Sequence, residues 1–192
     1  GWISQAYLTY GFGNTSIKVG RQPLPKGLSP FAFSEDWNVF ANTFDAVLVV
    51  NTDITDTALV YAFVDGGNVN SQLGTPMNQF NDLNQDDGVH MLTVQNKSIP
   101  MTTLTATYYD VAKVAGSIGA TALWIDAKVA GKDLPMGLKI GLQGGQVSTD
   151  STGFDDTTAM GGKVSLKAMD ALTLVGAYTY ASGSKNKEVV AI

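Results

Sequence analysis

The stretch Ala6-Tyr-Leu-Thr-Tyr-Gly-Phe-Gly-Asn-Thr-Ser-Ile-Lys-Val-Gly-Arg-Gln22 decides the fold. Apolar side chains alternate with polar or small ones on both sides of Gly13-Asn14. A period of two places one set of side chains on each face of a strand. Gly-Asn between two such runs is typical of a tight hairpin turn. The stretch therefore predicts an antiparallel hairpin with one apolar and one polar face. The apolar set is Ala6, Leu8, Tyr10, Phe12, Ile17 and Val19.

The same alternation recurs along all 192 residues and never gives way to a helical period. It predicts strands over residues 3–12, 15–22, 44–51, 57–65, 88–96, 102–110, 118–127, 137–147, 157–168 and 171–181. Short connections alternate with generally longer ones, which fall at residues 23–43, 66–87, 111–117 and 148–156. Tight turns at one end and longer loops at the other are typical of up-and-down membrane barrels. We therefore predict an all-β, antiparallel, up-and-down transmembrane β-barrel.

Composition supports a membrane barrel over a soluble domain. Charged residues make up 15% of the chain, against about 25% in ordinary soluble domains. In 137–147, Leu138, Ile140 and Leu142 oppose Lys139 and Gln143, so the first set is expected to face lipid and the second a watery lumen. Alternation also describes half-buried soluble sheets, so a soluble core stays the alternative. Aromatic girdles at the membrane edges are expected to include Tyr108, Trp124, Tyr178 and Tyr180.

Several function classes are disfavoured by what the chain contains. A net charge of -5 with a single arginine argues against nucleic-acid binding. The absence of cysteine excludes disulfides and cysteine-based zinc sites. No apolar run reaches the length of a transmembrane helix, about 18 residues. The lone histidine, His90, has no catalytic motif around it, so we predict that the protein is not an enzyme.

Two parts of the chain carry a family resemblance. Residues 13–22, 42–46 and 51–61 resemble the major outer membrane porins of Campylobacter-type bacteria and, more distantly, the substrate-specific porins of Pseudomonas. The hairpin at 160–167 and 172–180 looks like a further family hairpin. The chain departs from the family pattern at Pro23–Gly27, where an acidic-Thr-Pro sequence is usual, and at Ala41, which replaces a proline.

The resemblance implies a porin that passes small hydrophilic solutes and ions passively through a water-filled channel. It also implies a homotrimer in contact with lipid, in the outer membrane of a Gram-negative bacterium. Family barrels have roughly 16 to 18 strands. We therefore expect these ten strands, the single segment 1–192, to be part of a longer protein, with 66–87 as a long extracellular loop.

The loop at 23–43 is the best candidate for a pore constriction. It is rich in proline, glycine and aromatic residues, and Glu35 and Asp36 lie near its middle. Folded inward, these carboxylates would face Lys18, Arg21 or Lys26, and opposed charges would select solutes by charge and dipole. An ordinary outer loop packed by its own aromatics is the alternative. Strict alternation aims Arg21 at lipid, so we expect either a bulge that turns it inward or a position at the membrane edge.

Two further sets of residues are candidates for binding. Lys18, Lys139, Lys163 and Lys167 fall on the predicted lumen face and form a cationic track, or are simply solvated. Asp82, Asn84 and Asp86 have the alternate spacing of calcium ligands, but Thr93 stands where an EF-hand has glutamate. An EF-hand is therefore excluded. A different Ca²⁺ site remains a weak hypothesis beside a solvated acidic loop, and no other cofactor is expected.

Two alternatives from other classes stay open. A β-rich surface or filament protein of the adhesin or surface-layer type would use unpaired sheet edges to add strands. A soluble ligand-binding barrel would require a sealed apolar interior, which is opposite to the polar inner face predicted above.

Overall fold

The computed structural model describes residues 3–34, 42–68, 80–84, 87–115, 118–151, 153 and 155–182. These residues form one antiparallel sheet with a single short 3-10 turn, η1 (Pro135–Gly137). The strands are β1 (Ala6–Phe12), β2 (Thr15–Gln22), β3 (Phe44–Asn51), β4 (Thr57–Gly67), β5 (Asn81–Asp82), β6 (Val89–Asn96), β7 (Thr102–Ala115), β8 (Ile118–Ala130), β9 (Lys139–Thr149), β10 (Thr157–Met169) and β11 (Leu172–Ala181). No helix among the described residues is long and apolar enough to cross a membrane.

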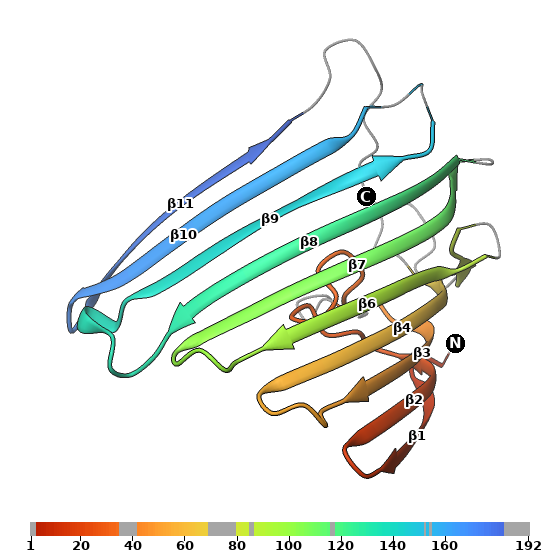
Figure 1. The fold of residues 1–192 in the computed structure, drawn as a ribbon, viewed down its shortest axis with the longest axis horizontal. Helices are drawn as coiled ribbons and strands as arrows, with labels where there is room; N and C mark the ends of the chain where they lie inside the picture. Colours follow the sequence, from red (N-terminus) through yellow and green to blue (C-terminus); the bar gives the residue numbers. More distant parts are fainter. Residues whose placement is uncertain are drawn as a thin grey trace.

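The ten long strands follow one another in the sheet in chain order, each antiparallel to the next. The two-residue β5 pairs with the end of β4. The sheet is open, with β1 and β11 at its two edges. Its short connections lie together at the lower left edge in Figure 1, and the longer ones at the opposite edge. The predicted up-and-down architecture is therefore confirmed.

The predicted strands agree with the observed ones to within a few residues, except that the strand predicted over 102–110 extends into the connection predicted at 111–117. β7 continues to Ala115 and β8 begins at Ile118, so most of that predicted loop is strand. The register shifts between Val111 and Ala115. Such an irregularity changes the alternation of side chains, which explains why the sequence pattern breaks there.

Left-handed residues close several of the short connections. Gly13 has φ +53°, and Asp56 and Met101 have φ 55° and 58°. In the last two turns the following residue donates back to the chain, as Thr102 N does to Ile99 O at 3.0 Å. A positive φ lets two or three residues reverse the chain without splaying the strands. These turns fix the register at this end of the sheet.

The register separates the side chains into two faces. We call the face that carries Val60, Thr107 and Lys163 the inner face and the opposite one the outer face. The outer face is apolar and uncovered by any described residue, with Leu8 81%, Ile125 53% and Leu174 52% exposed. The predicted division of 137–147 into apolar and polar faces is confirmed, because Ile140 and Leu142 lie opposite in orientation to Lys139 and Gln143.

Of the four aromatic residues expected in a girdle, the three tyrosines lie on the outer face and the tryptophan does not. Tyr108, Tyr178 and Tyr180 are exposed on the outer face. Trp124 pairs with Thr107 and Gly145 and belongs to the inner face. A methyl group at Gly145 would overlap the Trp124 ring, so the glycine leaves the space that this side chain occupies. Trp124 is therefore a lining residue and not an outer girdle residue.

Candidate functional site

Residues 23–34, which we call the inward segment, fold back onto the inner face of the sheet. Two hydrogen bonds join the two ends of the segment. Leu24 N donates to Ser34 Oγ at 3.1 Å, and Ser34 N donates to Leu24 O at 2.9 Å. A turn at its beginning is made by Leu28 N and Ser29 N, which both donate to Pro25 O at 3.0 Å. Residues 23–34 of the loop predicted at 23–43 therefore form a closed segment that lies against the inner face of the sheet.

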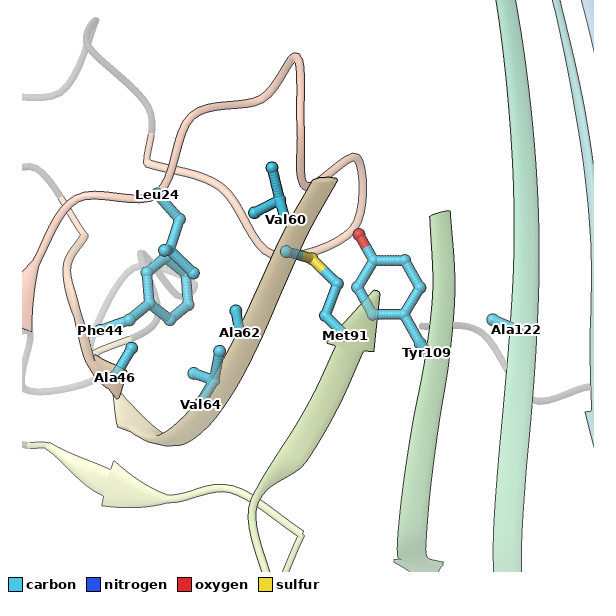
Figure 2. Packing of buried hydrophobic residues seen from close by; sticks show 9 residues of the cluster. All are labelled: Leu24, Phe44, Ala46, Val60, Ala62, Val64, Met91, Tyr109 and Ala122. Atoms are coloured by element: carbon cyan, nitrogen blue, oxygen red, sulfur yellow. The ribbon is translucent and has the colours of Figure 1, made fainter. Parts of the chain in front are cut away.

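A hydrophobic cluster fixes the inward segment to the strands beneath it. Leu24 is 1% exposed and packs in one cluster with inner-face residues from β3 to β8 (Figure 2). Those residues are Phe44, Ala46, Val60, Ala62, Val64, Met91, Tyr109 and Ala122, with Leu28 and Phe31 of the segment packed against them. Burying one leucine side chain stabilises by about 1.5–3 kcal/mol. The segment is therefore packed as a core element and is not a loosely attached loop.

Polar contacts add a second attachment, which we call the latch. The Tyr109 hydroxyl accepts a hydrogen bond from Phe31 N at 3.2 Å and lies 3.4 Å from Ser29 Oγ. Thr93 Oγ1 donates to Leu28 O at 2.7 Å and lies 2.9 Å from Thr107 Oγ1. A buried polar group without a hydrogen-bond partner lowers the stability of the fold, so these contacts favour a single position of the segment on the sheet.

The tip of the segment meets the wall of β7, β8 and β9. The Phe31 ring lies 5.2 Å from the rings of Tyr109 and Trp124, edge-on to the latter. A cleft of about 80 Å³ remains between the segment and the wall. Its lining combines cations, a carboxylate, hydroxyls, an amide and an indole: Lys26, Gly27, Pro30, Thr105, Thr107, Trp124, Asp126, Lys128 and Gln143.

The four lysines predicted on the lumen face all belong to the inner face by register. Lys18 lies on β2 with its Nζ 3.7 Å from the centre of the Tyr7 ring. Lys163 lies on β10 in the row that contains Gly141, and Lys139 lies on β9 in the neighbouring row of the inner face. Lys167 sits at the end of β10 and pairs with Asp170 at 2.9 Å. The structure thus brings Lys139, Lys163 and Lys167 into one region and leaves Lys18 apart from it.

Two charged residues of this region, Asp126 and Lys128, are not among the candidates predicted from the sequence. Lys128 is in the same row as Gly141 and Lys163, and its Nζ lies 2.9 Å from Asp126 Oδ1. Asp126 has the same parity as Trp124 along β8, and Lys128 lies just beyond the end of the strand predicted over 118–127. A methyl group at Gly141 would meet nothing within 4 Å, so there is open space among these lysines.

Arg21 lies on the outer face at the loop end of β2. It is opposite Asp45, and its Nε and Nη2 donate to the two carboxylate oxygens at 2.9 and 2.8 Å. Nη1 donates to Ile3 O at 3.1 Å, and the guanidinium carbon is 3.4 Å from the centre of the Phe80 ring. Of the two arrangements expected for Arg21, the structure has the one at the edge, with the guanidinium paired on the face opposite to the inward segment.

The structure describes only one of the other three charged residues expected at the constriction. Lys26 is on the inward segment, with its Nζ 4.3 Å from the centre of the Phe33 ring. Glu35 and Asp36 lie outside the described residues. Their opposition to the lysines therefore stays a prediction.

The expected Ca²⁺ ligands are only partly described. The Asn84 side chain accepts a hydrogen bond from Lys113 N and donates to Gly88 O at 2.6 Å. It therefore fixes the loop to the end of β7, and its oxygen is already used. Asp86 lies outside the described residues, and within them no group of three histidine or acidic side chains is arranged to hold a metal.

Comparison with solved structures identifies the architecture. The chain superposes on Pseudomonas aeruginosa OpdO with a TM-score of 0.73 at 19% identity, covering 92% of this chain and 46% of that one. For the P. aeruginosa outer membrane protein OpdK the TM-score is 0.75 at 14% identity, with 92% and 47% covered. Acinetobacter baumannii OccAB2 gives 0.64 at 16% identity, with 93% and 48% covered. No family model and no curated sequence matches the chain.

These likenesses establish the fold. The chain has the architecture of part of an outer-membrane β-barrel, and it spans about half the length of the structures that it matches. The neighbours include Pseudomonas porins, the more distant of the two families that the sequence resembles.

Proposed function

We propose that the chain is part of a porin that lets small hydrophilic solutes and ions diffuse passively through a water-filled channel. One observation carries the proposal. The inward segment is packed and latched onto the inner face of a sheet whose outer face is apolar and uncovered by described residues. A soluble sheet would cover its apolar face and leave its polar face to water. In this sheet the apolar outer face is the uncovered one, and polar side chains lie on the inner face beyond the inward segment, which suits lipid outside and water inside.

The inner face gives the channel a preference for anionic solutes. Lys128, Lys139 and Lys163 surround the open space at Gly141, with Lys167 at the end of β10. Clustered cations raise the local concentration of anions near a wall and lower that of cations. OpdK has been solved with vanillate. A small carboxylate is therefore a reasonable first solute to test.

The inward segment is proposed to narrow the channel. Because the segment packs on β3 to β8, Lys26, Gly27 and Pro30 lie above the wall of the lumen. We infer that Glu35 and Asp36 continue this constriction and oppose the lysines, which would produce a transverse field that favours polar solutes. Arg21 is assigned to the edge of the barrel and not to the constriction, because Asp45 and Ile3 O take up its donors on the outer face.

The proposed porin function also indicates where the protein is found in the cell. We propose that the full-length protein lies in the outer membrane of a Gram-negative bacterium, contacts lipid through the outer face and assembles as a homotrimer. The motif residues at 13–22 and 42–46 support a closer kinship to the Campylobacter-type porins than to the Pseudomonas ones. We propose no catalytic activity and no cofactor.

Reconstitution of the full-length protein in a planar lipid bilayer tests the function. The proposal predicts stepwise single-channel currents in KCl, carried preferentially by chloride relative to a variant without the inner lysines. A protein that remains in detergent-free solution and gives no current would contradict it. Growth of fibres from the same sample would favour the structural alternative, in which free sheet edges add strands.

A further inference from the structure

Gln22 is a buried polar side chain to which the proposed channel function gives no role. It is the last residue of β2 and directly precedes the inward segment. Its side chain is fully buried on the inner face, opposite Phe44 of β3. Glutamine is mostly exposed in proteins, because burying an amide lowers stability unless its hydrogen bonds are made. The contacts of Gln22 therefore have to account for its burial at this place.

The amide nitrogen of Gln22 faces three backbone carbonyl groups. Nε2 lies 2.9 Å from Ala46 O on β3 and 3.2 Å from both Lys18 O and Gly20 O on β2 itself. An amide has two N–H donors, so the three acceptors share them. The opposite orientation of the amide would bring Oε1 against three carbonyl oxygens. Gln22 therefore has one favoured orientation, and it joins the end of β2 to β3 at a fixed point.

The backbone of β2 has an unusual conformation at one of these three acceptors. Gly20 has φ +117°, which residues with a side chain rarely adopt, and a Cβ there would lie 2.5 Å from Ala6 O. A glycine inside a strand marks a bulge or a close approach of another backbone. Here β1 is the close neighbour, while Gly20 O contacts the Gln22 amide. Gly20 and Gln22 together thus shape the end of β2.

The other end of the Gln22 amide is not satisfied. Oε1 is buried, and no described residue donates a hydrogen bond to it. An unpaired buried acceptor lowers stability, so stability alone does not favour an amide at this position. Buried polar contacts do restrict a chain to one arrangement. The amide therefore contributes geometry at the point where the inward segment begins.

We propose that Gln22 is a positioning residue for the constriction, which it sets by fixing where the chain leaves β2. This inference rests on the proposed channel function. Two residues later Leu24 is 1% exposed, and its N and O are bonded to Ser34 at the other end of the segment. A displacement at Gln22 is therefore passed to both ends of the segment. It moves Lys26, which lines the cleft between the segment and the wall.

Single-channel recording of Gln22→Met in the full-length protein tests the proposal. Methionine has a similar length and no N–H, so the three carbonyls lose their common donor. The variant is expected to visit current sublevels about tenfold more often than wild type, the effect of roughly one lost hydrogen bond on a two-state equilibrium. Hydrogen exchange at the amide of Ser34 is expected to accelerate by a similar factor. An effect on stability alone would reduce the number of folded channels and leave the current of each open channel steady.

A matched variant controls for the loss of an amide from the inner face. Gln95→Met makes the same change on β6, where Gln95 Nε2 donates to Thr105 Oγ1 at 3.2 Å, and is expected to keep the wild-type current. If Gln22→Met does not fold, Gln22→Asn is recorded instead, since its amide is one methylene too short to reach Ala46 O.

The outcomes separate this proposal from the channel function. Steady wild-type currents from folded Gln22→Met or Gln22→Asn would overturn the role of Gln22. Sublevels that are equally frequent in Gln95→Met would overturn it as well. Absence of any channel current from the wild-type protein would instead reject the channel function itself.

Discussion

The strands β3 to β7 and β9 to β11 have the same alternation of residues, but their inner faces differ. One is covered by the inward segment and the other is not. The first region lies under the inward segment, where Val60 is fully buried and Met91 is 2% exposed. The second carries lysines, threonines and glycines, and Val175 of β11 is 59% exposed. Alternation therefore assigns a side chain to a face, whereas a distant segment decides whether that face becomes a buried core or a solvated wall.

The largest expected effect comes from removing the central apolar contact of the covered region. Leu24→Ala should cost about 2–5 kcal/mol, because it deletes a buried side chain and leaves a cavity. Thermal unfolding of the full-length protein in detergent measures this loss. Val175→Ala, on the uncovered region, should cost less than about 0.5 kcal/mol. Equal losses at the two sites would remove the distinction between the regions.

The latch should contribute a smaller amount. Tyr109→Phe keeps the ring and removes the hydroxyl that accepts from Phe31 N, leaving a part-buried donor without its partner. The expected cost is about 1–2 kcal/mol. Hydrogen exchange at the amide of Phe31 should accelerate in this variant. Tyr108→Phe, on the outer face, is the matched control and should leave that exchange unchanged.

The edge position of Arg21 can be separated from a role in the channel. Arg21→Gln should lower stability by about 0.5–1 kcal/mol, as expected for a half-exposed ion pair. Single-channel conductance and ion selectivity should not change, because Arg21 and Asp45 lie on the outer face. A clear change in conductance would place Arg21 in the constriction after all.

The lysines of the uncovered region should act on selectivity and not on stability. Lys139→Gln combined with Lys163→Gln should lower the chloride-to-potassium permeability ratio about twofold at 0.1 M salt, and less at 1 M because ions screen the charges. Lys132→Gln, in the short turn after β8, is the control. A ratio that is unaffected by the double change would mean that these lysines are simply solvated.

The smallest effect concerns the short turn that follows β3. Hydrogen bonds from the Asn51 and Asn14 side chains hold the pKa of Asp53 below its ordinary value. Because the folded-state pKa is depressed, this contribution to stability is present above the unfolded pKa of about 3.9 and is lost as pH falls through the folded value. A pH titration of the Asp53 carboxyl by NMR should therefore show a midpoint below about 3.9, the ordinary value for an aspartate. A midpoint at or above that value would contradict it.

The sequence was sufficient for the strands because period-two alternation and turn residues are local signals. Ile140 and Lys139 could be assigned to opposite faces from their positions alone. The residues of the sheet that the inward segment contacts could not be predicted from the sequence. Its partners Val60, Met91 and Tyr109 are some 30 to 80 residues away along the chain, and no local pattern pairs them with Leu24 or Phe31.

The errors concern residues whose surroundings override a local rule. Trp124 was assigned to an outer girdle because aromatics are common there, yet Gly145 on the next strand makes room for it inside. Asp126 shares the parity of Trp124 in β8 and so belongs to the inner face, and Lys128 lies beyond the end of the strand predicted over 118–127. Alternation aimed Arg21 outward, and the pair with Asp45 shows how the fold accommodates a guanidinium on that face.

The central claim is that the inward segment lies in the path of the current. The chain has no cysteine, so Lys26→Cys places a single thiol on that segment. The measurement is the single-channel current of the full-length protein before and after addition of a charged, water-soluble thiol reagent. The current should fall stepwise for this variant and should not change for Leu174→Cys on the outer face. An unchanged current after complete labelling of Lys26→Cys would contradict it.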